Sequence, residues 1–451
     1  MLLQSTCGKI VAGGSSLPPH EVKNMEKMDN EIKRGCGIDI DSITLWVTIF
    51  IITLRGTRTD TKEFSNTVSG IKELKKWLKR KRISHVAFES TGYFWQMLYS
   101  FLETDFTIVV ANPRQIKQLK GKKTDRLDSK SLAILLRNGA IRPSFILPKE
   151  FREFRDLTRQ YQNLVHDLVR VKNRIRQTLW HACIPLDKCM SDIFGKSGHA
   201  IIEALINGVP GKEAAQLAKG RLKGRIALIE EALRFPLSNH YREVLDRYWE
   251  QYLSLKEEIS QLNREIDTKM SPYNAVIQRL CSIPGIGRKL AQSILSEIGI
   301  DMTRFPNAKH FASWTKLCPG NNSSAGKRKS GRNSRGNKYV RSYLVEAAWA
   351  AVSSRGSAFR SLYYRRAARL GRKKAIISIA HKLLRIIYKV LSDGSEYSAA
   401  YESELCQNMR ISVARKRLRE FDNEELVSEL LSRGVKTVTW SWEEDEPVLT
   451  V

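Results

Sequence analysis

The chain has 451 residues, and its 76 lysine and arginine residues outnumber its 47 acidic residues, which gives a formal net charge of +29. A surplus of this size predicts association with a polyanion, and nucleic acid is the first candidate. Hydrophobic residues make up 42% of the chain, which excludes disorder throughout. No apolar run reaches the about 18 residues that a membrane span needs. We therefore expect a cytoplasmic protein of two or three domains with no membrane partner.

Cysteine usage and the N-terminus exclude two further classes of protein. The seven cysteines are scattered and odd in number, and no C-x-x-C pair occurs, so neither a disulfide framework nor a structural zinc site is expected. Residues 1–34 are polar, rich in glycine and serine, and lack the charged-then-apolar pattern of a signal peptide. We expect them to form a flexible extension.

Regular patterning begins at Cys36 and predicts an α/β domain over residues 35–147. Residues 37–40 and 45–54 predict two strands, followed by a polar turn over 55–60 with room for a third strand nearby. Helices and strands alternate beyond this point. The predicted elements are a helix over 66–82, a strand over 85–88, a helix over 93–102, a strand over 106–111, a helix opened by Pro113 and a helix over 125–137.

Four acidic residues of this domain are candidate metal ligands in an otherwise basic chain. Asp39 lies mid-strand between two isoleucines, where a charge is costly unless it is paired or bound to a cation. Glu89 ends a strand, and active groups of α/β sheets collect at strand ends. Asp125 and Asp128 are three residues apart on a predicted helix and so share one face. Such a set can converge on two Mg²⁺ ions about 3.5–4 Å apart.

Each acid also has a purely structural interpretation. Asp125 is a favoured N-cap for the helix that begins there. Asp128 can pair with a neighbouring cation, and Glu89 can simply be exposed at its strand end. Asp41 is a rival ligand, although its position after the first strand is typical of a turn former. The joint occurrence of the four acids, in order on these elements, favours a metal site.

Residues 148–271 change to a helical period and predict a helical coiled-coil arm. Two stretches, 157–175 and 245–266, carry apolar residues in alternating steps of four and three, with charged outer faces. A shorter helical region over 192–235 lies between them. The two long helices can fold back on each other as an antiparallel arm, and a dimerising coiled coil is equally compatible with the pattern.

A mostly helical third domain is predicted over 272–394. Residues 283–287, Ile-Pro-Gly-Ile-Gly, precede a helix over 288–298 and resemble half of a helix-hairpin-helix, in which backbone N–H groups meet a phosphate. A helix over 375–391 follows three cations suited to phosphate contacts and carries an apolar stripe suited to packing. The remaining predicted elements are a helix over 340–353 and, in a disordered or self-shielding tail over 395–451, a helix near 424–431.

A glycine-rich basic loop over 319–341 is the candidate nucleic-acid contact of the third domain. Glycine lets the backbone approach a phosphodiester, and lysine and arginine neutralise its charge. A serine in this setting can be a nucleophile if a metal ion or base activates its hydroxyl, although composition alone favours a loop that only grips phosphate. The candidate contacts are Lys123 of the first domain and Lys327, Arg328, Lys329, Arg332, Arg335, Lys338 and Arg341.

In their order, these stretches resemble the DEDD-type insertion-sequence transposases, which are DNA recombinases with an RNase-H/RuvC-like N-terminal domain and a serine-bearing C-terminal transposase domain. The resemblance spans residues 35–392. Each segment alone is weakly specific, whereas the ordered set is highly specific. The matching segments are 37–39 (Gly-Ile-Asp), 89–92 (Glu-Ser-Thr-Gly), 112–113 (Asn-Pro), 123–128 (Lys-Thr-Asp-Arg-Leu-Asp), 283–287, 318–322 (Cys-Pro-Gly-Asn-Asn), 324–327 (Ser-Ala-Gly-Lys), 336–337 (Gly-Asn) and 340–341 (Val-Arg).

The resemblance implies a Mg²⁺-dependent transposase that cleaves and rejoins DNA. It makes Ser324 the nucleophile that forms a phosphoserine intermediate with DNA, with Ser323 as a neighbouring rival. Many members have two glycines after the serine, where this chain has Ala325 and Gly326. The residues that match the acidic tetrad of the family are Asp39, Glu89, Asp125 and Asp128.

The resemblance also implies partners for the chain. Members use an element-encoded structured guide RNA that pairs with donor and target DNA. They act as a homo-oligomer, a dimer or a tetramer, and share an active site between the N-terminal domain of one subunit and the C-terminal domain of another. A bacterial nucleoid-associated location is the corresponding expectation.

Two alternatives remain open from the sequence. The first is a metal-dependent RuvC-like junction nuclease that uses activated water and no serine chemistry. The second is a non-catalytic nucleic-acid-binding protein that packages its partner, in which the four acids would have no chemical role.

Overall fold

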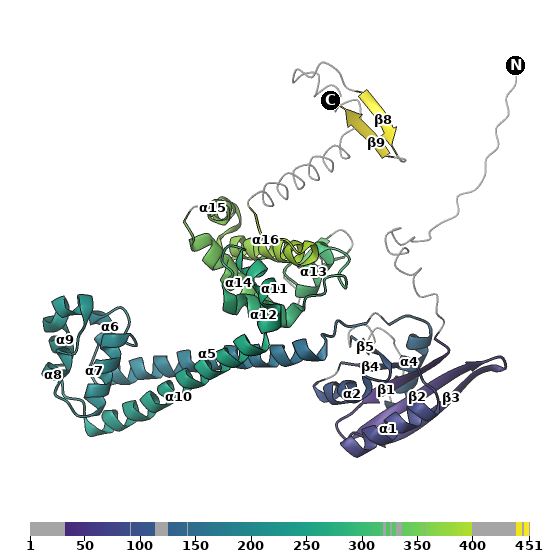
Figure 1. Ribbon diagram of the computed structural model, residues 1–451, viewed down its shortest axis with the longest axis horizontal. Coiled ribbons are helices and arrows are strands. Elements are labelled where there is room, and N and C mark those ends of the chain that lie inside the picture. Colours follow the sequence, from purple (N-terminus) through teal and green to yellow (C-terminus); the bar gives the residue numbers. More distant parts are fainter. Residues whose placement is uncertain are drawn as a thin grey trace. The chain divides into compact units, whose positions relative to one another are not determined.

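The computed structural model describes most of the chain (Figure 1). The side chains of residues 125–126, of 322–324 and 327–330, and of the C-terminal hairpin are outside this description, as are the predicted helices at Pro113 and near 424–431. Contacts divide the chain into two compact units, Met1–Ile146 and Leu147–Val451. The described residues are 32–90, 92–112, 125–141, 143–318, 322–324, 327–330, 336–355, 357–398, 439–443 and 446–450.

The first unit is built on a five-stranded mixed sheet with the strand order β3-β2-β1-β4-β5. The first three strands in the sequence pair antiparallel, and β4 and β5 extend the sheet in parallel from β1. The strands are β1 (Arg34–Ile40), β2 (Thr44–Thr53), β3 (Gly56–Ser65), β4 (His85–Glu89) and β5 (Thr107–Ala111).

Helices cover both faces of this sheet. Helices α1 (Val68–Arg80) and α2 (Phe94–Leu102) share one core with alternate residues of the strands, including Cys36, Ile38 and Phe88. Helix α4 (Asp125–Arg137) buries Ala133 and Leu136 in a separate small core with Phe50 and Ala87. The strand order and the layers confirm the predicted RNase-H/RuvC-like α/β fold.

The polar turn predicted over 55–60 is wrong, because β3 begins at Gly56 and pairs with β2 along its whole length. Nine of its ten residues are exposed or half-buried, and Phe64 is the buried one. An edge strand with this pattern lacks the alternation of apolar and polar residues by which strands are recognised.

The second unit begins with a long helical arm. Helices α5 (Lys149–His181) and α10 (Asn239–Lys269) lie side by side (Figure 1). Lys172 lies over the ring of Tyr252, and Phe151 contacts Tyr273 just beyond α10, so the two helices run antiparallel. The far end is closed by α6 (Leu186–Cys189), α7 (Lys196–Ile206), α8 (Gly211–Ala215), the 3-10 helix η2 (Gly220–Arg225) and α9 (Ile226–Ala232).

The rest of the second unit is mostly helical, as predicted. Helix α16 packs against α11, α13, α14 and α15 through the apolar stripe seen in the sequence, whose members Ile376, Ile379, Leu383 and Ile387 are all buried. Helices α11, α13 and α15 were not predicted. The elements are η3 (Ser271–Tyr273), α11 (Asn274–Cys281), α12 (Arg288–Ile298), α13 (Ala308–Thr315), α14 (Lys338–Ser353), α15 (Ala358–Leu370) and α16 (Arg372–Asp393).

Two hairpins correct the sequence predictions. Strands β6 (Asn322–Ser324) and β7 (Lys327–Ser330) pair antiparallel within the stretch that was predicted to be loop throughout. Strands β8 (Thr439–Glu443) and β9 (Glu446–Thr450) form a second antiparallel pair in the tail, where no strand was predicted. Within the described part of the chain, no helix is both long and apolar enough to cross a membrane.

Candidate active site

Two of the four predicted acids lie at the same end of neighbouring parallel strands: Asp39 is the last residue but one of β1, and Glu89 is the last residue of β4. The register of β1 and β4 pairs Gly37 with Ala87 and Ile38 with Phe88, and Asp39 and Glu89 are the next residue on each strand. Because residues in register on parallel strands share a face, both acids lie on the same side of the sheet. They also lie at the carboxyl ends of the parallel strands, where α/β sheets place their ligands.

Helix α4 lies on that same face, directly against β1. A Cβ added at Gly37 would lie 2.4 Å from both the carbonyl oxygen of Ser129 and the amide nitrogen of Ala133. A Cβ added at Gly35 would lie 3.1 Å from Cδ2 of Leu136. As β1 advances from residue 35 to residue 37, its neighbour on α4 moves back toward the start of the helix. The helix therefore runs antiparallel to β1.

This direction places the start of α4 beside Asp39. Two further strand residues advance by about 6.6 Å, which is the rise of about four to five helical residues. Moving that far back from the Ser129–Ala133 contact reaches the first turn of α4, where Asp125 and Asp128 lie. The backbone thus brings β1, β4 and the first turn of α4, with all four predicted acids, toward one edge of the sheet.

The carboxylates themselves are half-buried. Asp39, Glu89 and Asp128 are each neither fully buried nor fully exposed, and the side chain of Asp125 is outside the description. Among the residues whose side chains are described, no group of three or more histidine, cysteine or acidic side chains could hold a metal ion. Asp39, Glu89 and Asp128 alone therefore do not close a metal cage.

Buried hydroxyl groups fix α4 to the sheet next to the acids. The hydroxyl of Thr48, opposite Gly37 in the β1–β2 register, hydrogen-bonds to that of Ser129 at 2.8 Å and to that of Thr61 at 3.0 Å. Thr48 and Ser129 are fully buried. Because Ser129 follows Asp128 directly, this contact also sets the position of that acid.

Asp41, the rival ligand, stabilises the turn between β1 and β2. Its backbone N–H donates to the carbonyl of Thr44 at 2.9 Å, and its carboxylate accepts from the backbone N–H of Ile43 at 3.4 Å. Backbone hydrogen bonds from Ser42 and then Ile43 hold the pKa of this exposed carboxyl below its usual value.

The predicted nucleophile lies on the hairpin of the second unit. Ser324 is the last residue of β6 and pairs in register with Lys327, the first residue of β7, while Ser323 pairs with Arg328. The register shifts between Asn322 and Ser323. Lys329 lies on β7, and Lys338 and Arg341 are exposed on the first turn of α14. Lys123, Arg332 and Arg335 are outside the described residues.

One buried carboxylate was not singled out from the sequence. Glu297, near the end of α12, has a fully buried side chain that binds Arg159 of the arm and Asn337 at the start of α14. The sequence signal was available, because Glu297 lies among Ile294, Leu295 and Ile298, much as Asp39 lies between two isoleucines. Asn337 was noted only as part of a motif.

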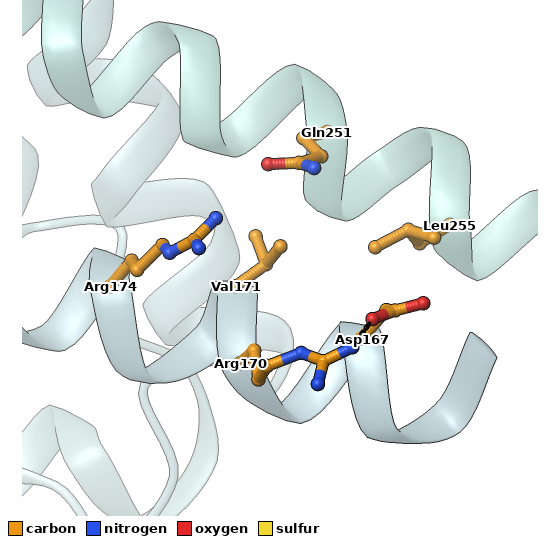
Figure 2. Close-up of a pocket in the computed structure, with 6 residues that line it drawn as sticks. All are labelled: Asp167, Arg170, Val171, Arg174, Gln251 and Leu255. Carbon is orange, nitrogen blue, oxygen red and sulfur yellow. Dashed lines mark hydrogen bonds and ion pairs between the residues drawn. The ribbon is translucent and has the colours of Figure 1, made fainter. Parts of the chain in front are cut away.

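A cavity of about 460 Å³ lies on the arm between α5 and α10, away from the serine hairpin in the sequence. Figure 2 shows that Arg170 and Arg174 line one side of it, with Asp167 paired to Arg170. Gln251 faces them from α10. None of the four predicted acids lines this cavity, so it is not the candidate active site.

Comparison with known proteins identifies the family. A family model described as a transposase, of the DEDD type of IS110, matches residues 36–184. A second model, described as the transposase IS116/IS110/IS902 family, matches residues 277–364.

Solved structures of Thermus thermophilus RuvC, one of them in complex with a Holliday junction substrate, are 14% identical over 25% of this chain and 99% of RuvC, with a TM-score of 0.20. A score this low adds nothing to the strand order described above.

Two curated relatives match across most of their own length. A "Probable family 20 transposase" of Pseudomonas aeruginosa is 26% identical over 69% of this chain and 85% of the relative. The transposase for insertion sequence element IS1111A of Coxiella burnetii is 23% identical over 70% of this chain and 80% of the relative. The chain belongs to the IS110 family of DEDD-type insertion-sequence transposases, which are DNA-acting enzymes.

Proposed function

We propose that this transposase cleaves and rejoins DNA with Mg²⁺ bound at the edge of the N-terminal sheet and with Ser324 as its nucleophile. The observation that supports the proposal most is the backbone placement of Asp39, Glu89 and the first turn of α4 on one face of the sheet. Acids from three elements collect there in a basic protein, an arrangement that a bound cation would stabilise.

The donor set fits a hard divalent cation. Carboxylate oxygens are the ligands that Mg²⁺ prefers, and it commonly retains several waters beside one or two carboxylates. A pair of Mg²⁺ ions would be held by the four acids, Asp39, Glu89, Asp125 and Asp128. Bound Mg²⁺ supplies Lewis-acid stabilisation of the charge that develops on the phosphate oxygens. Since three of the acids form no cage by themselves, Asp125 or a DNA phosphate oxygen would complete the ligand set.

The serine step exchanges one phosphoester bond for another, so the strands can be rejoined without an external energy source. The Oγ atom of Ser324 forms a bond to phosphorus, and the bond from phosphorus to the departing strand's oxygen breaks. The serine proton passes to a base, and the departing oxygen takes up a proton. In rejoining, the hydroxyl of an incoming strand attacks the phosphoserine, and Ser324 regains its proton. Lys327, whose backbone pairs in register with that of Ser324, would offset phosphate charge.

We propose DNA and RNA as the polyanions that the positive charge serves. DNA follows from the transposase family, and the structured guide RNA rests on the family resemblance alone. The described candidate contacts are Lys327, Arg328 and Lys329 on the hairpin, with Lys338 and Arg341 exposed on α14. Because base pairing would select the sequence, the protein would contact mainly the nucleic-acid backbone and recognise its shape.

The proposed division of labour follows the domains predicted from the sequence. Residues 35–147 carry the acids, 148–271 form the arm, and 272–394 carry the serine. Residues 1–34 and 395–451 have no assigned chemistry. The acids and Ser324 must meet at one phosphate, within one subunit or between subunits of an oligomer, as the family resemblance implies.

Trapping a covalent protein–DNA adduct tests the serine chemistry. The full chain, incubated with element-end DNA, the element's RNA and Mg²⁺, should give an adduct that survives denaturant. Ser324→Ala should abolish the adduct, and Ser323→Ala, the matched control one residue earlier, should leave it intact. Cleavage without an adduct, unchanged in Ser324→Ala, would instead support the water-activated nuclease.

A further inference from the structure

The segment that carries the serine hairpin leaves and rejoins the helical domain at one place. Lys316 ends α13 in a left-handed conformation with φ 58°. A Cβ added at Gly336 would lie 2.5 Å from Cγ of Lys316 and 2.8 Å from the carbonyl oxygen of Thr315. Only glycine allows the chain to pass this close. Thr315, Lys316, Gly336 and Asn337 therefore form a closed neck, and β6 and β7 belong to the segment between its two sides.

The neck is tied to Glu297 through Asn337. The Nδ2 group of Asn337 donates a hydrogen bond of 2.6 Å to Oε2 of Glu297. The Oδ1 atom of Asn337 accepts from the backbone N–H groups of Tyr339 and Val340, at 3.0 and 3.3 Å, and so caps the N-terminus of α14. The oxygen of the Asn337 amide thus caps α14, and its nitrogen fixes the neck to Glu297.

Glu297 is held in turn by the arm. Arg159 of α5 donates from Nε to Oε1 at 2.6 Å and from a terminal nitrogen to Oε2 at 3.0 Å. Beside this pair, the hydroxyls of Thr158 and Ser296 hydrogen-bond at 2.7 Å. The guanidinium of Arg159 also lies 4.3 Å from the ring centre of Tyr339, on the first turn of α14. One buried carboxylate therefore joins the arm helix to the base of the serine segment.

Stability alone does not account for this arrangement. A buried ion pair is often no more stabilising than well-packed apolar side chains of the same volume. Its advantage is geometric, because a bidentate guanidinium–carboxylate pair fixes both position and orientation. Beyond their mutual pair, Glu297 contacts Asn337 of the neck and Arg159 lies over Tyr339 on the first turn of α14, which is where orientation matters for the hairpin.

We propose that Glu297 is a positioning residue that locks the neck of the serine hairpin to the arm, so that the orientation of the arm sets the orientation of Ser324. The catalytic part of this inference rests on the proposed nucleophilic role of Ser324. The mechanical part, a neck held by Glu297, does not. The two parts are tested by separate measurements on the same variants.

Hydrogen exchange of the full-length chain tests the mechanical part. Asn337→Ser keeps a side-chain oxygen to cap α14 and removes only the donor to Glu297. We expect amides of residues 322–330 to exchange at least about tenfold faster, with α14 and the melting temperature little changed. Glu297→Gln should give the same local change. Asp267→Asn, which removes a different ionic tie of α12, is the matched control and should leave residues 322–330 unchanged.

A swapped pair distinguishes a specific tie from general loosening. In the double variant Glu297→Gln with Asn337→Asp, the glutamine amide can donate to the new carboxylate, so the hydrogen bond is restored with reversed direction. Exchange over 322–330 should then return toward the wild-type rate. Asn337→Asp alone should exchange fastest of all, because it sets a second carboxylate against that of Glu297. Unchanged exchange in Asn337→Ser, or acceleration spread evenly over α12, α14 and the hairpin, would overturn the proposal.

Adduct formation tests the catalytic part. Asn337→Ser should slow formation of the serine–DNA adduct by at least about tenfold, because a small misplacement of a reacting group is expensive in rate. Its DNA affinity should stay the same, and the swapped pair should recover the rate. Ser324→Ala should leave the exchange pattern as in the wild type, so failure of the serine assignment and failure of the neck are told apart. An unchanged adduct rate in Asn337→Ser would overturn the catalytic part.

Discussion

Gly37 of β1 lies so close to Ser129 of α4 that a single added methyl carbon would lie 2.4 Å from the Ser129 carbonyl oxygen. This contact sets the height of α4 above the sheet, and through it the distance from Asp128 to Asp39. A glycine and a backbone carbonyl thus control the geometry of a candidate catalytic site in which neither has a chemical role.

Gly37→Ala should therefore damage activity as well as stability. The helix must move away from β1, and overpacking of this kind costs about 1–3 kcal/mol. Mg²⁺-dependent DNA cleavage should fall further than the loss of folded protein explains, because the first turn of α4 moves with the helix. Thermal unfolding and cleavage rate are the measurements. Gly224→Ala is the control, since a Cβ there meets nothing within 4 Å, and it should behave as wild type.

Thr48→Val should destabilise the first unit. It keeps the shape of Thr48 and removes the hydroxyl that bonds to buried Ser129. A lost hydrogen bond between two buried hydroxyls costs about 0.5–1.5 kcal/mol, measurable by denaturant unfolding. Ser129→Ala should cost less in this variant than in the wild type, because the hydrogen bond between the two hydroxyls is already lost. A double variant less stable than the sum of both single variants would contradict this account.

Asp267 should contribute a pH-dependent tie at the base of the arm. Partial burial raises the pKa of Asp267, but hydrogen bonds from Lys289, Gln292 and Arg288 outweigh it and lower that pKa to about 2. A depressed folded-state pKa gives stability that is present above the unfolded pKa and lost as the pH falls toward 2. Asp267→Asn should destabilise the protein by about 0.5–1 kcal/mol at pH 7, a small value because the pair is partly exposed.

The test of this prediction is the difference in unfolding free energy between wild type and Asp267→Asn across pH. The difference should be constant from pH 7 to about 5 and should shrink below about 4, where the unfolded carboxyl begins to protonate. A difference that grew on acidification would have the wrong sign for a depressed pKa.

Mixing two inactive variants tests whether the acids and the serine act between subunits. If each active site takes acids from one subunit and the serine from another, a mixed oligomer of Asp39→Asn and Ser324→Ala subunits has sites with both groups intact. Cleavage should reappear on mixing, in proportion to the mixed species. If both groups come from one subunit, every site lacks one of them and the mixture should stay inactive.

The sequence was sufficient for the elements that carry the four acids, and the reasons are local. Asp39 stands out between Ile38 and Ile40, and α4 has a clear helical period. Strand β3 escaped prediction because its edge position leaves it polar. Helix α15 escaped because many arginines obscure its apolar face, and α13 is short. These two helices are recognisable only through their packing on α16.

Tertiary relationships set the limit of what the sequence predicts. That α4 runs antiparallel to β1, and so brings its first turn to Asp39, depends on the close contacts at Gly35 and Gly37. The tie from Arg159 through Glu297 to Asn337 joins residues separated by 138 and 40 positions. No periodicity reports such a contact. The apolar neighbours of Glu297 could have indicated that its carboxylate is paired, but they do not identify the partner residue.

The rate of Mg²⁺-dependent cleavage of element-end DNA by Asp39→Asn, compared with Asp41→Asn, is the most direct test of the central claim. The two acids are two residues apart; one lies on the proposed metal face, and the other is exposed and caps a turn. With the RNA of the element present, Asp39→Asn should lose at least about a hundredfold in rate, while Asp41→Asn stays within about twofold because surface substitutions are mostly neutral. Equal rates in both variants would contradict a metal site at this edge of the sheet.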